Sequence, residues 1–282
     1  MRAARDPFLD SRVNEGRVLA VIPARIGSER LPEKPLYTLA GRPLIEWVWR
    51  RVCALSTPEA VVVATDSERV VAACGAFGAK VELTSREHVS GTDRVAEIAR
   101  RTEYEGYDII VNVQGDEPFL EEAEVRGAVD EVRRGREIGT AATPVRTLVA
   151  WRDPAVVKVA RRSDGAALYF TRSPIPHHRA GEPGPELLSP KRLASSLYLR
   201  HVGVYAYTRA ALLAWSALPQ SALEAVERLE QLRPLEAGMT IGVALVDDSA
   251  GGIDTPEDAR RAEARLRGES PEVPATRKTG RP

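Results

Sequence analysis

The sequence predicts an α/β fold with a doubly wound, mostly parallel sheet and a smaller, mixed α+β sub-lobe. Over about the first 140 residues, short apolar runs alternate with helical patterns, which is typical of parallel strands joined by helices. Runs such as VVVA and DIIVNV are apolar without a break, as expected for strands covered on both faces. Farther along, the apolar segments lengthen and look antiparallel, which places the sub-lobe at roughly residues 145–200.

The individual elements of the first part follow from the spacing of apolar residues. Continuous apolar runs indicate strands, and apolar residues three or four positions apart indicate helices. The expected strands are 17–24, 60–66, 80–84 and 107–116, and the expected helices are 43–55, 67–79, 92–102 and 121–135.

The second part mixes extended and helical patterns. Residues 140–148, 155–172 and 198–209 look like strands, and Ser-Asp-Gly in the middle segment predicts a hairpin turn. A stretch rich in Pro, Gly and Ser predicts a long surface loop over 175–194. The closing pattern predicts helices over 222–238 and 255–268 on either side of a strand over 240–248.

Composition restricts the classes of partner and compartment. The chain has 282 residues, with 40 basic and 40 acidic side chains, so its formal net charge is zero. A chain without excess positive charge is not expected to bind nucleic acid or an anionic membrane. No apolar run is long enough to span a membrane, and we expect a single domain over 18–267, a polar extension over 1–17 and a disordered tail over 268–282. The two cysteines, Cys53 and Cys74, lie in helical patterns and are interpreted as core residues of a cytoplasmic protein.

Polar motifs follow four of the expected parallel strands. They are the basic loop PARIGSERLPEKP, Asp66, HVSGTDR and QGDEP. Ligands of open parallel sheets bind beyond the carboxyl ends of the strands, so we expect one cleft to collect all four motifs.

The basic loop predicts an anion site of an unusual kind. It matches neither a Walker A loop nor GxGxxG, because it has one glycine and the three cations Arg25, Arg30 and Lys34. Such a loop suits a polyphosphate held by side chains rather than by backbone alone. The alternative is a solvated basic loop, which its position at the end of the first strand disfavours.

Two acids, far apart in the chain, predict a metal site. Asp116 ends an apolar strand, where its motif could instead be only a turn. Asp254 precedes a helix start that Thr255 and Asp258 already satisfy as a capping box, so its carboxylate is available. Two carboxylates facing a polyphosphate are typical of a Mg²⁺ site for phosphoryl or nucleotidyl transfer.

Eight motifs together resemble a known family. IPARIGSERLPEKPL, ATDSERV, HVSGTDRVAE, VNVQGDEP, LYFTRSPIP, LRHVGVYAY, LEQLRPLEAG and GIDTPED occur in the order seen in 3-deoxy-manno-octulosonate cytidylyltransferases, over about residues 18–267. The resemblance implies a nucleotide-diphospho-sugar transferase-like fold. It also implies a Mg²⁺-dependent reaction of CTP with 3-deoxy-D-manno-octulosonate (KDO), giving CMP-KDO and pyrophosphate for the lipopolysaccharide core.

The resemblance also implies roles for individual residues. Asp116 and Asp254 match the magnesium-binding aspartates and, with Arg25 and Lys34, the catalytic set. The residues that match the CTP site are Arg25, Ser28, Arg30, Lys34, Ser90, Thr92 and Arg94. The residues that match the sugar pocket are Gln114, His201, Tyr205, Glu230 and Gln231. From the residues alone, His201 could be a structural strand histidine, and the polar residues of LEQLRP a solvated helix face.

The implied mechanism is attack of the sugar's anomeric hydroxyl on the α-phosphorus of CTP, without a protein general base. The family resemblance also implies a homodimer through the sub-lobe. The first loop reads IGSER where a bulkier aromatic version is common, which affects only detailed nucleotide contacts.

Alternatives from the sequence are a cytidylyltransferase for N-acylneuraminate or amino-substituted KDO, a sugar-1-phosphate nucleotidyltransferase, and a non-catalytic nucleotide-binding protein. The motifs RHVGVYAY and LEQLR favour the octulosonate, and a sugar-1-phosphate enzyme usually opens with a loop richer in glycine. A non-catalytic protein would not need both Asp116 and Asp254.

Overall fold

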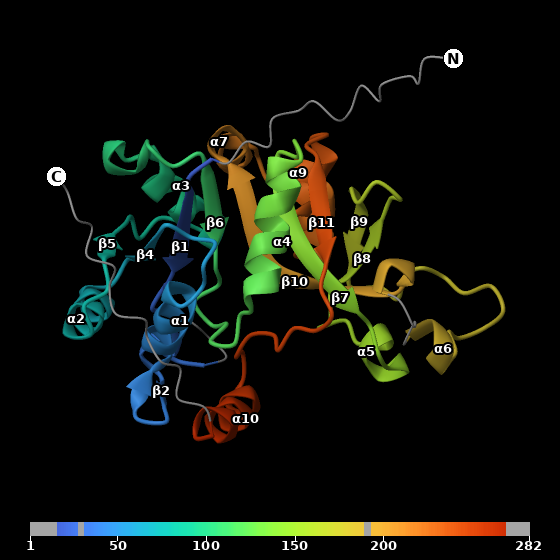
Figure 1. Cartoon of the computed structure of the whole chain (residues 1–282), viewed down its shortest axis with the longest axis horizontal. Coiled ribbons are helices and arrows are strands. Elements are labelled where there is room, and N and C mark those ends of the chain that lie inside the picture. The colour runs from blue at the N-terminus through green and yellow to red at the C-terminus, as the bar shows by residue number, and fades with distance from the viewer. Residues whose placement is uncertain (1–15, 28–30, 189–192, 269–282) are drawn as a thin grey trace, which may run out of the picture.

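The structure, a computed structural model, describes residues 16–27, 31–188 and 193–268. Most of the expected extension and almost all of the expected tail therefore lie outside the described residues. Within the described part, a nine-stranded sheet has the order β11-β7-β10-β6-β1-β4-β5, with β8 and β9 branching from β10 (Figure 1). No helix of the described residues is long and apolar enough to span a membrane.

The half of the sheet that precedes the sub-lobe is parallel, as predicted. Its strands are β1 (Val18–Pro23), β4 (Ala60–Thr65), β5 (Val81–Leu83) and β6 (Ile109–Asn112). β1 pairs in parallel with both β4 and β6, and β4 pairs in parallel with β5. Their carboxyl ends therefore meet at one edge, which is where the polar motifs begin.

The other half of the sheet is mixed. β10 (Leu199–Thr208) runs antiparallel between β6 and β7 (Ile138–Pro144), and β11 (Ile241–Leu245) is parallel to β7. A register shift between Val202 and Tyr205 interrupts the pairing of β10 with β7. This irregularity lies beside the end of β6, because Tyr205 pairs with Asn112.

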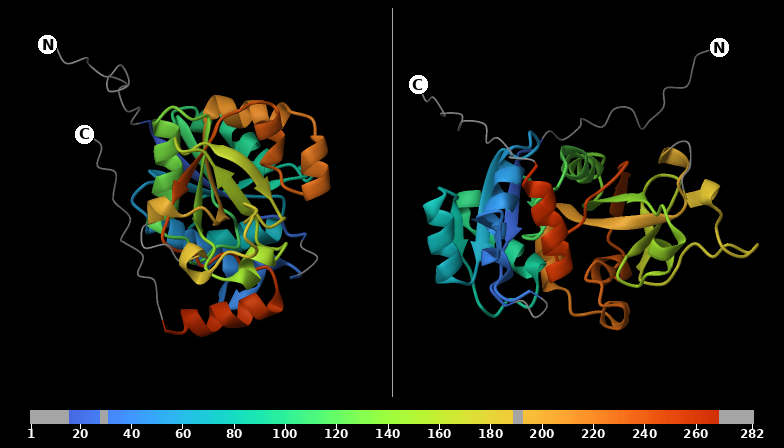
Figure 2. Two further views of the ribbon diagram at one scale, coloured as in Figure 1. Left: turned by 90° about the vertical axis from the view of Figure 1, so that its right-hand side faces the viewer. Right: turned by 90° about the horizontal axis from the view of Figure 1, so that it is seen from below.

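Helices cover both faces of the sheet, which confirms the doubly wound architecture (Figure 2). The first face buries apolar residues of α1 (Leu44–Cys53), α2 (Glu68–Ala76), α4 (Glu122–Arg133) and α10 (Pro256–Leu266). The second face buries those of α3 (Gly91–Arg100) and α7 (Arg209–Ala217). Cys74 is buried in the first core and Cys53 is half-buried, and burial raises the pKa of the Cys53 thiol to about 11.

The sub-lobe extends from the β7 and β10 side of the sheet (Figure 1). It contains α5 (Leu148–Arg152), β8 (Lys158–Arg161), β9 (Ala167–Thr171), α6 (Pro185–Leu188) and the 3₁₀ turn η3 (Leu193–Ser195). The predicted hairpin turn is present between β8 and β9, where Gly165 has a φ of 91°. The expectation of a long surface loop over 175–194 is wrong in part, because α6 buries Leu188 in a small core with Trp151 and Tyr198.

The predicted continuous helix over 222–238 is wrong. The chain forms α8 (Ala222–Glu227) and α9 (Leu232–Glu236), separated at Arg228, whose φ is 53°. The guanidinium of Arg172 donates to the carbonyls of Glu227 at 2.8 Å and of Arg228 at 3.3 Å, which a continuing helix would need as acceptors. Glu230, which was expected within a helix, therefore lies on the connection between α8 and α9.

A buried ion pair holds α8 and α9 together. Arg233 donates two hydrogen bonds to Glu224, at 2.7 and 2.6 Å. The two side chains are 11% and 5% exposed, so little water screens the pair. The pair thereby fixes the connection that carries Glu230.

We expect Arg233→Met to lower the free energy of unfolding by about 3 kcal/mol, because Glu224 keeps a buried charge without its partner. Urea denaturation measures this difference. The matched control is Arg267→Met, since Arg267 pairs with Glu263 while 72% exposed. The control should lose less than about 1 kcal/mol, and equal losses in both variants would contradict the interpretation.

Candidate functional site

A cleft of about 650 Å³ opens at the carboxyl edge of the parallel strands. Three of the four predicted motifs line it, and Asp254 joins them from the far end of the chain. The predicted site residues on its wall are Arg25, Lys34, Ser90, Arg94, Gln114, Asp116, Glu230 and Asp254. Ser28 and Arg30 lie outside the described residues, and Thr92, Gln231, His201 and Tyr205 are not among the residues that line the cleft.

The two predicted acids converge on one cation. Lys34 Nζ donates to Asp116 and, at 2.9 Å, to Asp254 Oδ1. Asp116 follows β6, and Asp254 directly precedes α10. Motifs that are far apart in the sequence thus form one ionic cluster, in which an ammonium lies between two carboxylates.

Backbone contacts hold these two acidic segments against each other. The amide of Ile253 donates to the carbonyl of Asp116 at 2.9 Å. A Cβ at Gly252 would lie 3.1 Å from Asp116 Oδ1, and a Cβ at Gly115 would lie 2.7 Å from the Pro23 carbonyl oxygen. Glycine at both positions therefore permits the close approach of three chain segments.

The predicted capping box at the start of α10 is present. Thr255 Oγ1 accepts from the Asp258 amide at 3.2 Å, and Asp258 accepts from the amides of Thr255 at 2.9 Å and Asp254 at 3.2 Å. Asp258 thus satisfies the helix start, which leaves the Asp254 carboxylate to face Lys34.

Burial controls the protonation of the acidic cluster. Burial raises the pKa of Asp116, the nearby Asp254 carboxylate adds to the effect, and Lys34 opposes it. Burial also raises the pKa of Glu117 to about 8, with Asp116 contributing, so Glu117 carries a proton at neutral pH. Burial disfavours the charged form of Lys34, but the two aspartates outweigh it, and the pKa of Lys34 rises.

The donor atoms around Lys34 fit a hard divalent cation. Carboxylate oxygens are the ligands that Mg²⁺ prefers, and Mg²⁺ commonly keeps water and phosphate oxygens in its remaining positions. The described residues contain no cluster of three or more acidic, histidine or cysteine side chains with metal-binding geometry. The protein can therefore supply Asp116 and Asp254, and the other ligands would come from solvent or substrate.

The amino-terminal turn of α3 forms another wall of the cleft. Ser90 caps the helix by accepting from the Asp93 amide at 3.1 Å, and its hydroxyl also donates to Asp93 at 2.9 Å. The free amides at a helix start favour anionic or polar ligands. The neighbouring Val89 lines the cleft while 79% exposed. It was not among the predicted site residues, although it is the apolar residue of the polar motif HVSGT.

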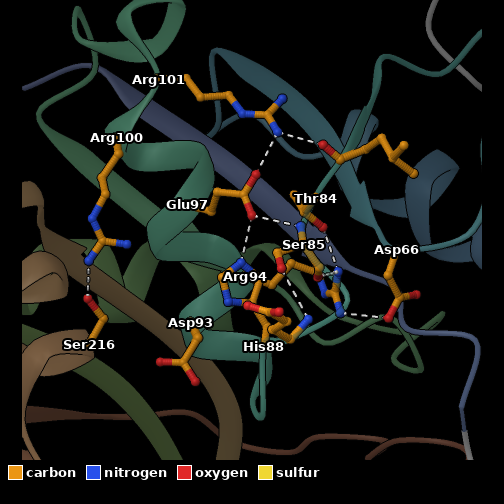
Figure 3. Close-up of polar contacts among 12 residues, drawn as sticks. Asp66, Thr84, Ser85, His88, Asp93, Arg94, Glu97, Arg100, Arg101 and Ser216 are labelled. Carbon is orange, nitrogen blue, oxygen red and sulfur yellow. Dashed lines mark hydrogen bonds and ion pairs between the residues drawn. The ribbon is translucent and has the colours of Figure 1, made fainter.

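Arg94 lines the cleft, but its guanidinium forms hydrogen bonds with other residues of the protein (Figure 3). The residue is 2% exposed and donates to Asp66 Oδ2 at 2.9 Å, to Thr84, and to the Ser85 carbonyl at 3.2 Å. Asp66 in turn accepts from the amide of Ile26 at 3.4 Å. Asp66 therefore lies behind the cleft rather than in it, and with Arg94 it ties α3 to the basic loop.

A second network in Figure 3 holds the loop that precedes α3. Glu97 accepts from the Ser85 amide at 2.9 Å and from Arg101 at 2.8 Å, and it contacts His88 Nε2 at 2.6 Å. Burial opposes ionisation of Glu97, but these three partners outweigh it and lower its pKa to about 2. The loop that carries Val89 is thereby fastened to the middle of α3.

The predicted sugar residues lie on the side of the sheet that faces α3 and α7. Thr92 Oγ1 donates to Glu230 Oε2 at 3.1 Å, so a predicted nucleotide residue contacts a predicted sugar residue. Gln114 Nε2 donates to the carbonyl of Gly203 at 3.4 Å, within the irregular part of β10. Burial raises the pKa of Glu230, and the bond from Thr92 opposes this.

His201 and Tyr205 pack together behind the cleft wall. His201 Nε2 lies 2.9 Å from Thr140 Oγ1, and burial lowers its pKa to about 3, so the imidazole is neutral. The hydroxyl of Tyr205 is buried and makes no hydrogen bond with any described residue. An unpaired buried hydroxyl is costly, which makes it a candidate group for a polar ligand or water.

Comparison with known proteins identifies the class. The chain belongs to the cytidylyltransferase family, whose sequence model matches residues 19–241. Within that class it belongs with the 3-deoxy-manno-octulosonate cytidylyltransferases. It is 48% identical to the one from Gemmatimonas aurantiaca, over 87% of this chain and 92% of the relative. It is 44% identical to the one from Xanthomonas campestris pv. campestris, over 94% of this chain and 93% of the relative.

Solved structures agree with this assignment. A CMP:2-keto-3-deoxy-manno-octonic acid synthetase in complex with CTP matches with a TM-score of 0.79 and 37% identity, over 90% of this chain and all of that one. A 4-diphosphocytidyl-2C-methyl-D-erythritol synthase from Anaerococcus prevotii, at 12% identity and a TM-score of 0.58, shares the fold alone. The predicted α/β fold and the predicted family are both confirmed.

We expect the hydrogen bonds and ion pairs of Glu97 to stabilise the fold at neutral pH and to lose this contribution as the pH becomes acidic. The pKa of Glu97 falls from 4.5 to about 2 on folding, so its contribution is complete above pH 4.5 and is lost as the pH falls through 2. Because the side chain is partly solvated, Glu97→Gln should cost about 1 kcal/mol near pH 6 and progressively less toward pH 3. Urea denaturation across this range measures the difference, and a loss that is the same at every pH would contradict it.

Proposed function

We propose that this protein transfers the cytidylyl group of CTP to KDO and releases pyrophosphate. The convergence of Asp116 and Asp254 beside the basic loop is the observation that carries the proposal. It supports a metal-assisted nucleotidyl transfer in a chain whose relatives are named for this reaction. The anomeric hydroxyl of KDO would form the new bond to the α-phosphorus as the bond to the β-phosphate breaks and the hydroxyl proton passes to solvent.

The charged residues of the cleft suit the phosphates of CTP. Arg25 and Lys34 would neutralise the charge that develops on the departing pyrophosphate. Asp116 and Asp254 would hold Mg²⁺, which when bound lowers the pKa of the attacking hydroxyl and neutralises phosphate oxygens. No protein general base is needed, and none is assigned. Ser28 and Arg30 remain predicted phosphate contacts.

The walls around α3 suit a small pyrimidine nucleoside. Val89 offers an apolar side chain to a base, and the start of α3 offers backbone amides and the Ser90 hydroxyl to polar atoms of the nucleoside. Arg94 would act on the nucleotide indirectly, by holding α3 to the basic loop through Asp66.

The groups near the end of β6 suit a polyhydroxylated acid sugar. Gln114 and Glu230 line the cleft, and the unpaired hydroxyl of Tyr205 lies behind them. Because burial raises the pKa of Glu230, its protonated form can donate a hydrogen bond as well as accept one. His201 and Gln231 would support this pocket from β10 and from the connection between α8 and α9.

The alternatives remain an N-acylneuraminate or amino-substituted KDO as the sugar, or a protein that binds nucleotide without catalysis. The named relatives favour KDO. A non-catalytic protein gives no reason to bring Asp116 and Asp254 together. We also propose that the enzyme acts in the cytoplasm, where CTP is available.

We propose that the protein forms a homodimer through the sub-lobe. Among the described strands, β9 forms a ladder with β8 alone, and its other side carries an isolated bridge between Ala166, just before β9, and Gly242 of β11. Leu168 on β9 is 58% exposed. An edge strand that is paired on one side over its own length and carries an exposed leucine is a favourable surface for pairing with a second copy.

The function is tested by pyrophosphate release from CTP and Mg²⁺, with KDO compared with sialic acid. We expect release with KDO and at most a small fraction of that rate with sialic acid. Release with sialic acid but not with KDO would overturn the choice of sugar. Nucleotide binding without release with any keto-acid sugar would support the non-catalytic alternative.

The metal assignment predicts that Asp116→Asn and Asp254→Asn each lower kcat at least about 100-fold, which corresponds to roughly 3 kcal/mol of lost stabilisation of the transition state. Circular dichroism should show an intact fold. The control is Glu257→Gln, because Glu257 lies in the first turn of α10 but its side chain is 57% exposed and pairs with Arg260. Full activity in either aspartate variant would reject the assignment.

The dimer predicts a mass near twice 30.8 kDa in size-exclusion chromatography with light scattering at micromolar concentration. Leu168→Lys should shift the protein toward the monomer. Leu83→Lys is the control, since Leu83 is also exposed but lies on β5 at the opposite edge of the sheet. A monomeric wild-type protein would contradict the proposal.

A further inference from the structure

The position of Lys34 between the two aspartates is built into the fold. Lys34 begins the short 3₁₀ turn η1 (Lys34–Leu36), and its side chain is 14% exposed. The turn is closed by a bond from the Leu36 amide to the Glu33 carbonyl at 2.7 Å, and Pro35 is buried. Arg69 on α2 holds the Glu33 side chain with two hydrogen bonds, one of them 2.9 Å long. The ammonium is therefore presented by a fixed turn rather than by a mobile surface chain.

Lys34 Nζ contacts the two carboxylates, Asp116 and Asp254, that would hold a divalent cation. It contacts one carboxylate oxygen of Asp116 and, at 2.9 Å, one of Asp254. Two cations that contact the same carboxylate oxygens would lie close together and repel each other strongly. A metal ion that binds the aspartates must therefore displace the ammonium.

The protein supplies too few ligands for a free metal ion to displace the ammonium readily. Only two acidic ligands are present, and no third acidic, histidine or cysteine ligand joins them among the described residues. A triphosphate changes this balance in two ways. It supplies further oxygen ligands to the metal, and it supplies anionic acceptors to the displaced ammonium, because Lys34 and Arg25 line the same cleft.

We propose that Lys34 is an exchangeable counter-ion that keeps free Mg²⁺ off Asp116 and Asp254 and couples metal entry to nucleotide entry. When the magnesium complex of a nucleoside triphosphate enters, the aspartates exchange the ammonium for Mg²⁺ and Lys34 moves to the phosphates. Every charge remains paired before and after the exchange. This inference rests on the proposed nucleotidyl transfer and adds the order in which its components load.

The test is Mn²⁺ binding to the full-length protein without nucleotide or sugar, followed by electron paramagnetic resonance of the free ion. The wild-type protein should bind Mn²⁺ weakly. Lys34→Met should bind Mn²⁺ at least about tenfold more tightly, because the competing ammonium is gone, while its affinity for CTP without metal falls. Lys34→Gln provides a second neutral variant if the methionine variant does not fold, and Lys34→Arg, which keeps the charge, should resemble the wild type.

Two further variants locate the effect. Lys80→Met removes an exposed lysine that pairs with the single carboxylate of Glu103, and it should leave Mn²⁺ binding unchanged. Asp254→Asn in the Lys34→Met background should abolish the gain. Neutral Lys34 variants that bind Mn²⁺ no more tightly than the wild type would overturn the proposal. Because this titration contains no sugar and measures no turnover, its outcome is independent of which sugar the enzyme uses.

Discussion

The ionic bridge Asp116–Lys34–Asp254 is the interaction on which the organisation of the cleft depends. It joins the turn after β6, the turn η1 and the start of α10, which are far apart in the chain. The two negative carboxylates, which contact the same ammonium, would repel one another without a cation between them. The backbone bond from Ile253 to Asp116 and the glycines at 115 and 252 bring the segments close enough for one cation to serve both.

The mixed half of the sheet determines what lies beside this bridge. β10 runs antiparallel to β6, so Tyr205 pairs with Asn112. Asn112 is the last residue of β6 and precedes Asp116 by a few residues. The irregular pairing of β10 with β7 places the Gly203 carbonyl within reach of Gln114. A parallel strand in the same place would have set different side chains next to the acidic cluster, so the topology of the sub-lobe connection shapes the proposed sugar side of the cleft.

Much of the fold was predictable, because buried parallel strands leave continuous apolar runs such as AVVVAT in the sequence. The convergence of Asp116 and Asp254 was also predictable, since one follows a strand of the parallel sheet and the other is not needed by its helix cap. The break of the helix at Arg228 was not predictable from the local sequence. Arg172, which donates hydrogen bonds to the carbonyls of Glu227 and Arg228, is far from them in the sequence. The hydrogen bonds of Arg94 within the protein were not predicted for a similar reason, because its partners Asp66 and Thr84 follow other strands in the sequence.

The hydrogen bond from Thr92 to Glu230 has a consequence for how the enzyme can change. It joins the first turn of α3, the proposed nucleotide side, to the connection between α8 and α9, the proposed sugar side. The two residues contact each other directly, so the effects of their substitutions on substrate choice should not be additive. Redesign toward a different activated sugar would therefore have to vary the two walls jointly, and a library that randomises one wall at a time would miss the productive combinations.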